Sequence, residues 1–225
     1  MLDGYPGHEH AIPIYPLYGD LIKSFAQSQI CVTPTLIVSY GGPFAENYFW
    51  ETENAYSDPK LQYLMPYEEL AGKTRRDKAG WFSYDEQVFP KHAKSMKALV
   101  EAGGLAGIGS HGEFNGIGYH WEMWALQSGG MKPIDVLRTA TILGATGLGL
   151  DKDLGSLKVG KLADLVIMGK NPLENIRNTN SVVYVMKNGR LYDGNTCNEV
   201  YPAQRTLDRS EWNFEKPTNT TGVKE

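Results

Sequence analysis

The sequence has only two cysteines, no long hydrophobic run and no excess of positive charge. Cys31 and Cys197 stand far apart without a CxxC pair, which argues against a disulfide framework or a cysteine-ligated zinc site. No stretch of roughly 18 or more apolar residues occurs, so we expect no membrane-spanning helix and no membrane partner. The 22 Lys and Arg residues against 26 Asp and Glu residues give a net charge of −4, which provides no basic surface for nucleic acid.

The N-terminal residues, MLDGYPGHEHAIP, lack the basic and apolar regions of a signal peptide. A cytoplasmic location is therefore the default expectation for this chain, although a longer parent protein could be exported through a leader of its own. Hydrophobic residues make up 41% and charged residues 21% of the sequence, which is typical of a globular protein with a packed core.

Residues 1–150 alternate between helical and strand patterns, apart from an irregular excursion over 40–90. The expected elements are a helix over 17–29, a strand over 30–38, a helix over 91–104, a strand over 105–109, and helices over 119–130 and 132–150. This alternation is typical of a parallel α/β sheet or barrel. The excursion is rich in aromatic residues, glycine and charges, and we expect a surface lid or interface with short helices there.

Beyond residue 150 the pattern changes to short strands. The stretch 162–168 and the stretch 182–194 both favour strands, and Asn188-Gly189 inside the second is the strongest two-residue hairpin signal. We therefore predict a small β-domain over 151–210 and a disordered tail over 211–225.

Only five histidines occur, and some stand where α/β proteins carry chemistry. His8 and His10 form an HxH pair whose imidazoles, in an extended strand, would reach one metal ion from one face; a chance pair of polar residues is the alternative. His111 follows an apolar strand, where barrels place catalytic groups, and is otherwise a hydrogen-bonded loop residue. We expect His92 to be solvated, and His120 to pack on a helix face or to reach the mouth of a pocket.

Several motifs follow one another in a fixed order between residues 105 and 194. They are GIGSHG (107–112), HWEMWALQSGG (120–130), GSLKVGKLADLVIM (155–168) and VVYVMKNGRLYDG (182–194). In this order they resemble the amidohydrolase superfamily, in its imidazolonepropionase- and prolidase-like branch, and especially members in which the domain follows a β-propeller. The earlier motifs EHAIP and CVTPTLIVSYGG are similar to the sixth and seventh barrel strands of that family.

The resemblance implies both a fold class and a function. The fold would be α/β, with about the last three βα units of a (β/α)₈ metal-dependent-hydrolase barrel and a small β-sandwich composite domain beside them. The function would be hydrolysis of C–N bonds in small amides, cyclic amides or peptide-like molecules by metal-activated water. A complete relative would hold one or two divalent ions, and histidine ligands favour zinc.

The resemblance also assigns roles to residues. His10 matches the sixth-strand metal ligand, and His111 stands where most members have the eighth-strand Asp, so His111 is expected to act as a ligand or as the general base. Glu113 is a candidate substitute carboxylate, and His8 is a further candidate ligand. The expected pocket residues are Ser110, His120 and Tyr40.

The chain is short for the whole fold. A complete barrel takes about 250 residues, so strands one to five and their ligands are expected to be missing. The chain alone would then be an incomplete piece of the enzyme and could hold no metal. Exposed sheet edges would favour a homo-oligomer or pairing with the missing N-terminal half.

Two other hypotheses remain open. A non-catalytic barrel remnant would serve as a binding or oligomerisation module through the aromatic-rich segment 44–90. An independent mononuclear enzyme would use His8, His10 and His111. Metal content and hydrolysis separate these hypotheses, because a binding module requires neither.

Overall fold

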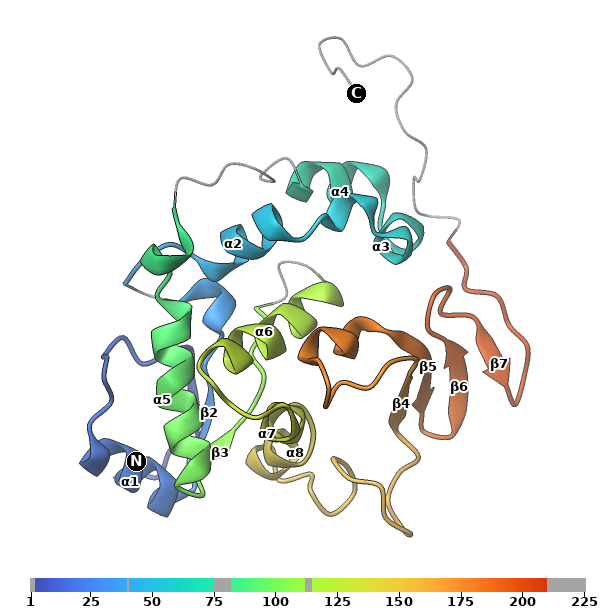
Figure 1. Ribbon diagram of the computed structural model, residues 1–225. Helices are drawn as coiled ribbons and strands as arrows, with labels where there is room; N and C mark the ends of the chain where they lie inside the picture. Colours follow the sequence, from blue (N-terminus) through green and yellow to red (C-terminus); the bar gives the residue numbers. More distant parts are fainter. Residues whose placement is uncertain (1–2, 40, 75–81, 112–114, 210–225) are drawn as a thin grey trace.

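The computed structural model describes residues 3–39, 41–74, 82–111 and 115–209 (Figure 1). The α-helices are α1 (Gly19–Ser28), α2 (Ala45–Thr52), α3 (Pro59–Leu64), α4 (Tyr67–Thr74), α5 (Phe89–Glu101), α6 (Ile117–Ser128), α7 (Pro133–Arg138) and α8 (Gly144–Gly147). The strands are β1 (Gly7–Glu9), β2 (Cys31–Thr33), β3 (Leu105–Ala106), β4 (Leu165–Met168), β5 (Val182–Lys187), β6 (Arg190–Asp193) and β7 (Glu199–Tyr201). The tighter turns are the 3₁₀ helices η1 (Leu36–Val38), η2 (Ala55–Ser57), η3 (Tyr84–Glu86) and η5 (Ile176–Asn180), with a π-helical turn, η4 (Thr139–Leu143), between α7 and α8.

The first three strands form a small parallel sheet in the order β1-β2-β3. Val32 in the central strand pairs with His8 on one side and Ala106 on the other. Val32 and Ala106 are fully buried in the core. Cys31 alternates to the opposite face, where Gly147 of α8 lies so close that an added methyl group would come within 2.3 Å of its Sγ. Helices therefore cover both faces, as a parallel sheet requires.

Both predicted strands of this sheet are shorter than expected. The strand predicted over 30–38 ends at Thr33, because Pro34 has no N–H to donate and Thr35 has a left-handed backbone with φ 49°. The strand predicted over 105–109 ends at Ala106. The predictions of parallel strands here are confirmed, and their C-terminal bounds are wrong.

The amphipathic patterns located the helices well. The structure confirms the helices predicted over 17–29, 91–104 and 119–130 as α1, α5 and α6. The helix predicted over 132–150 is divided into α7, the π-helical turn η4 and α8. His92 is a correction: it lies on the buried face of α5 and is only 7% exposed, because this face continues through Ala93 and Met96.

The segment predicted as a surface excursion over 40–90 contributes to the core. It forms the expected short helices, which arch over α6 towards the antiparallel sheet in Figure 1. Phe49 of α2 stacks on Trp121 of α6 with ring centroids 5.6 Å apart, and Trp50 meets the same indole edge-on at 5.1 Å. Aromatic burial of this kind anchors α2, so the prediction of a surface segment is wrong for α2.

Strands β4 to β7 form an antiparallel sheet in the order β4-β5-β6-β7. The hairpin predicted at Asn188-Gly189 is confirmed: Lys187 pairs with Arg190, and both turn residues have positive φ, 49° and 78°. Within the described ranges there is no second antiparallel sheet, so only one sheet of the predicted β-sandwich is seen. The predicted tail over 211–225 lies outside the described residues.

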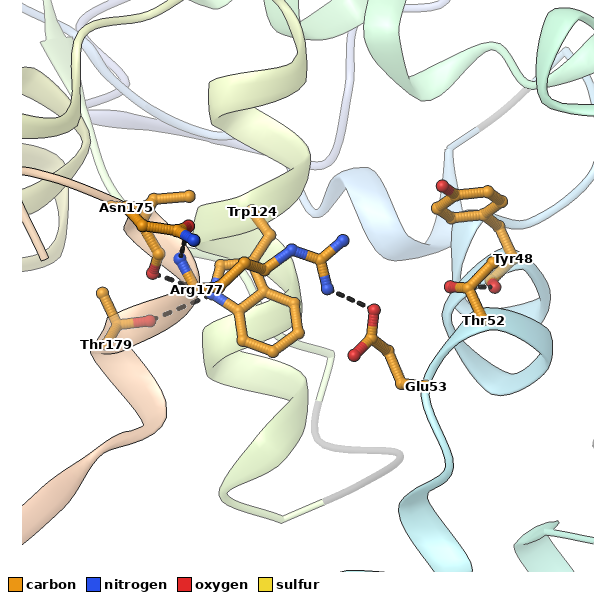
Figure 2. A network of polar contacts seen from close by, with 8 residues as sticks. Tyr48, Thr52, Glu53, Trp124, Asn175, Arg177 and Thr179 are labelled. Atoms are coloured by element: carbon orange, nitrogen blue, oxygen red, sulfur yellow. Dashed lines mark hydrogen bonds and ion pairs between the residues drawn. The ribbon is translucent and has the colours of Figure 1, made fainter. Parts of the chain in front are cut away.

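A polar network joins the segment before β5 to the helices (Figure 2). The indole Nε1 of Trp124 in α6 donates to the carbonyl of Ile176 at 3.1 Å and to Oγ1 of Thr179 at 3.0 Å. The Arg177 guanidinium lies 4.3 Å from the Trp124 ring centroid and pairs with Glu53 after α2. Buried hydrogen bonds and a cation–π contact thus attach η5 to both α6 and α2.

The part of the chain that the structure covers contains three parallel strands and no closed barrel. None of its helices combines the length and the apolar character needed to cross a membrane. The division into a domain over 1–150 and a second over 151–210 stays a prediction.

Gly129, directly after α6, provides a test of how closely α5 and α6 pack. A Cβ at this position would lie 2.3 Å from the carbonyl carbon of Ala93 and 2.4 Å from the amide nitrogen of Lys94. Gly129→Ala should therefore lower the free energy of unfolding by about 1–3 kcal/mol, measured by urea denaturation. Gly72→Ala is the matched control, because Gly72 lies in α4 with open space around it and should become slightly more stable. Equal stabilities of the two variants would contradict the packing.

Candidate functional site

The carboxyl edge of the parallel sheet brings two predicted site residues together. His10 follows β1 directly, and His111 follows β3 after a loop of four residues. Their rings are perpendicular neighbours, with centroids 5.8 Å apart and an interplanar angle of 70°. Both residues have left-handed backbones, with φ 67° and 58°. Because carboxyl ends of parallel strands share one edge, residues 101 positions apart in the sequence meet there.

The two histidines of the HxH pair have different neighbours. His8 lies within β1, and its ring meets Phe25 of α1 edge-on at 6.3 Å. Glu9 points to the opposite face, where one of its carboxylate oxygens accepts a hydrogen bond from Oγ1 of Thr33 in β2. The structure thus joins His10 to His111 and places the His8 ring against the helical layer.

The loop after β2 is held by a buried carboxylate from α6. Glu122 is fully buried, and its two oxygens accept hydrogen bonds from the backbone N–H groups of Leu36 at 2.8 Å and Ile37 at 3.0 Å. These are N–H groups at the start of η1, which have no partner within the turn itself. Burial raises the pKa of Glu122 to about 8, and the two backbone hydrogen bonds act in the opposite direction.

The remaining predicted residues have different positions. Ser110 lies half-buried on the loop between β3 and His111. Tyr40 and Glu113 lie outside the described residues. His120 is in the first turn of α6, and its Nδ1 is buried with no hydrogen-bond partner among the described residues. Burial and, to a smaller extent, the charge of Lys60 lower the pKa of His120 to about 4.

Two imidazoles at one edge fit part of a metal centre. Histidine nitrogens are ligands that zinc favours, and catalytic zinc sites in proteins use three protein ligands and an open position. Within the described ranges, no group of three or more His, Cys, Asp or Glu residues could hold a metal ion. His10 and His111 are thus fewer than the three ligands that such a site needs, and the described residues alone do not form one.

The sequence analysis did not single out Glu122 or Thr35. A signal for Glu122 was present, because it is the one acidic residue in the apolar run from Trp121 to Leu126. A carboxylate in such a run is buried only with compensating donors. Thr35 gave no comparable signal, because its left-handed backbone depends on contacts with residues far along the chain.

A hollow of about 150 Å³ lies between the segment 44–90, α5, α6 and η5. Most of its lining residues are aromatic, and Arg177 is among the others. The lining residues are Tyr48, Phe49, Tyr84, Phe89, Trp124, Gln127, Ser128 and Arg177. None of the predicted site residues that the structure describes lines it.

Residues 74–192, more than half of the chain, match the Amidohydrolase family. The chain belongs to this family. A curated relative is ochratoxinase from Aspergillus niger, which is 29% identical over 107 residues, covering 46% of this chain and 22% of that protein.

Solved structures show the same fold. A Xaa-Pro dipeptidase with methionine bound in its active site aligns with a TM-score of 0.53 and 21% identity, over 83% of this chain and 39% of that one. Molinate hydrolase aligns with a TM-score of 0.52 and 17% identity, over 98% of this chain and 43% of that one. The chain thus spans about two fifths of the length of these structures and 22% of the curated relative.

His120 predicts a specific dependence of stability on pH. The folded state holds this imidazole neutral down to about pH 4, whereas the unfolded chain protonates it below about pH 6.5. The unfolded state binds more protons in this window, so the contribution of His120 to stability is lost as the pH falls from about 6.5 to 4.

The variant His120→Asn isolates this effect. The difference in free energy of unfolding between the unsubstituted chain and the variant should shrink by about 2 kcal/mol between pH 7 and pH 4, measured by urea denaturation at each pH. Parallel stability curves for the two proteins would contradict a neutral, buried His120.

Proposed function

We propose that this chain contributes part of the active site of a metal-dependent hydrolase that cleaves C–N bonds in small amide, cyclic amide or peptide-like molecules. The observation that carries the proposal is the meeting of His10 and His111 at the carboxyl edge of the parallel sheet. Membership of the amidohydrolase family supports the reaction class. The names of two similar proteins, ochratoxinase and Xaa-Pro dipeptidase, support a small amide or peptide-like substrate.

The two histidines would have distinct roles. His10 would hold a divalent ion, in our proposal zinc, through an imidazole nitrogen. His111 would act as a second ligand. Its alternative role, as the general base that takes a proton from the attacking water, would leave zinc binding intact in a His111→Ala variant. A bound divalent ion supplies a water of lowered pKa and polarises the carbonyl group.

The proposal needs further ligands. His8, Glu113 and residues beyond this chain are the candidates, because the described residues bring only His10 and His111 together. A second copy of the chain would then complete the site, so we expect the chain to bind zinc without another protein. The substrate pocket would include Ser110, His120 and Tyr40.

Metal content tests the proposal directly. After dialysis against zinc-containing and then metal-free buffer, the chain should retain about one zinc ion, measured by elemental mass spectrometry. His10→Ala and His111→Ala should each lower the retained zinc to background, because each removes one of the two neighbouring imidazoles. A His8→Ala variant tests separately whether His8 is a further ligand.

His92→Gln is the matched control, because it removes an imidazole from α5. It should keep its zinc as long as circular dichroism shows the native fold. Zinc at background in the unsubstituted chain would contradict the proposal and favour a non-catalytic binding module.

A further inference from the structure

The two loops at the carboxyl edge touch each other through a glycine. Gly109 precedes His111 by two residues, and a Cβ on Gly109 would lie 2.3 Å from Oγ1 of Thr35 and 3.1 Å from its amide nitrogen. Gly107 is similarly close, with a Cβ 2.8 Å from the methyl group of Thr33. The path of the loop from β3 to His111 is therefore determined by where Thr33 and Thr35 lie.

Thr35 itself has an unfavourable backbone conformation. Its φ is 49°, in the left-handed region that a β-branched residue rarely enters. Such a conformation persists only where surrounding contacts impose it. The contacts that follow it directly are the hydrogen bonds from Leu36 and Ile37 to the buried Glu122.

These contacts form one continuous path. Glu122 binds the first two N–H groups of η1, η1 fixes Thr35, and Thr35 lies against Gly109. Two residues further on, His111 meets the ring of His10. The steps from Glu122 to Gly109 join buried or half-buried groups, so displacement of Glu122 should move the loop that carries His111.

We propose that Glu122 is a positioning residue that sets the distance between His10 and His111 through Thr35 and Gly109. As a contribution to hydrolysis this role rests on the proposed function. As a contribution to the geometry of the two imidazoles it does not, and it can be measured without metal.

Glu122→Gln tests the role with almost no change in volume. The oxygen of the glutamine amide accepts from one of the two N–H groups. Its NH₂ group faces the other N–H and cannot accept from it, so a buried donor is left unpaired. In the metal-free chain, proton NMR should show a ring-to-ring NOE between His10 and His111, assigned with single histidine variants. In Glu122→Gln this NOE should disappear, and amide hydrogen exchange of Leu36 and Ile37 should accelerate at least about ten-fold.

Glu199→Gln is the matched control. Glu199 is also a buried carboxylate, 5% exposed, and it pairs with Arg190 in the antiparallel sheet. This variant should leave the NOE and the exchange of Leu36 and Ile37 unchanged. Loss of the NOE in both variants would overturn the proposal, because it would indicate a general loss of structure.

A second substitution tests the path itself. Gly109→Ala should abolish the NOE without accelerating exchange at Leu36 and Ile37, since it acts beyond Glu122. This variant also decides the matter if Glu122→Gln does not fold. Retention of the NOE in Glu122→Gln or in Gly109→Ala would overturn the proposal.

Zinc affinity, measured by calorimetric titration, separates the two proposals. If the unsubstituted chain binds zinc, Glu122→Gln should weaken binding about ten-fold, as loss of supporting contacts around a metal site does. If the unsubstituted chain binds none, the proposed function fails. The NOE and hydrogen exchange then still decide the role of Glu122.

Discussion

The parallel alignment of three short strands is the constraint on which the candidate site depends. It brings the residues after β1, β2 and β3 to one edge, where His10, Thr35 and His111 all have left-handed backbones. Three non-glycine residues with this conformation at one edge are unusual, and strained backbone of this kind gathers at functional sites. Of these three residues, Thr35 directly precedes the two N–H groups that the buried Glu122 of α6 binds, so the loop after β2 depends on the helical layer as well as on the sheet.

The rest of the described chain supports that layer. α6 carries Glu122 towards the strands and Trp121 towards α2, while Trp124 binds the segment before β5. One helix therefore connects the parallel sheet, the aromatic segment 44–90 and the antiparallel sheet. Trp121, Glu122 and Trp124 of the HWEMW motif contact α2, η1 and η5, respectively.

Local patterns predicted the elements that local physics determines. The amphipathic repeats located α1, α5 and α6, and Asn188-Gly189 located the hairpin, because both signals depend on neighbouring residues. The strand-end position of His111 was predicted from the apolar stretch before it, whereas the place of His10 on a barrel strand was implied by the family resemblance. The predictions failed where contacts between distant residues determine the structure. Phe49 is buried against Trp121. The strand before Thr35 ends next to Leu36, whose N–H binds Glu122, a residue 86 positions further along the chain. The prediction that His92 is solvated was wrong, because its polar neighbours in the sequence concealed the buried face of α5.

The central claim is that His10 and His111 bind one metal ion together. X-ray absorption spectroscopy of the zinc-loaded chain tests it most directly, because it counts imidazole ligands. The expected result is a shell with two histidine nitrogens at about 2.0–2.1 Å from zinc, lost in the His10→Ala/His111→Ala double variant. A zinc shell that keeps its imidazole ligands in the double variant, or one without imidazole in the unsubstituted chain, would contradict the claim.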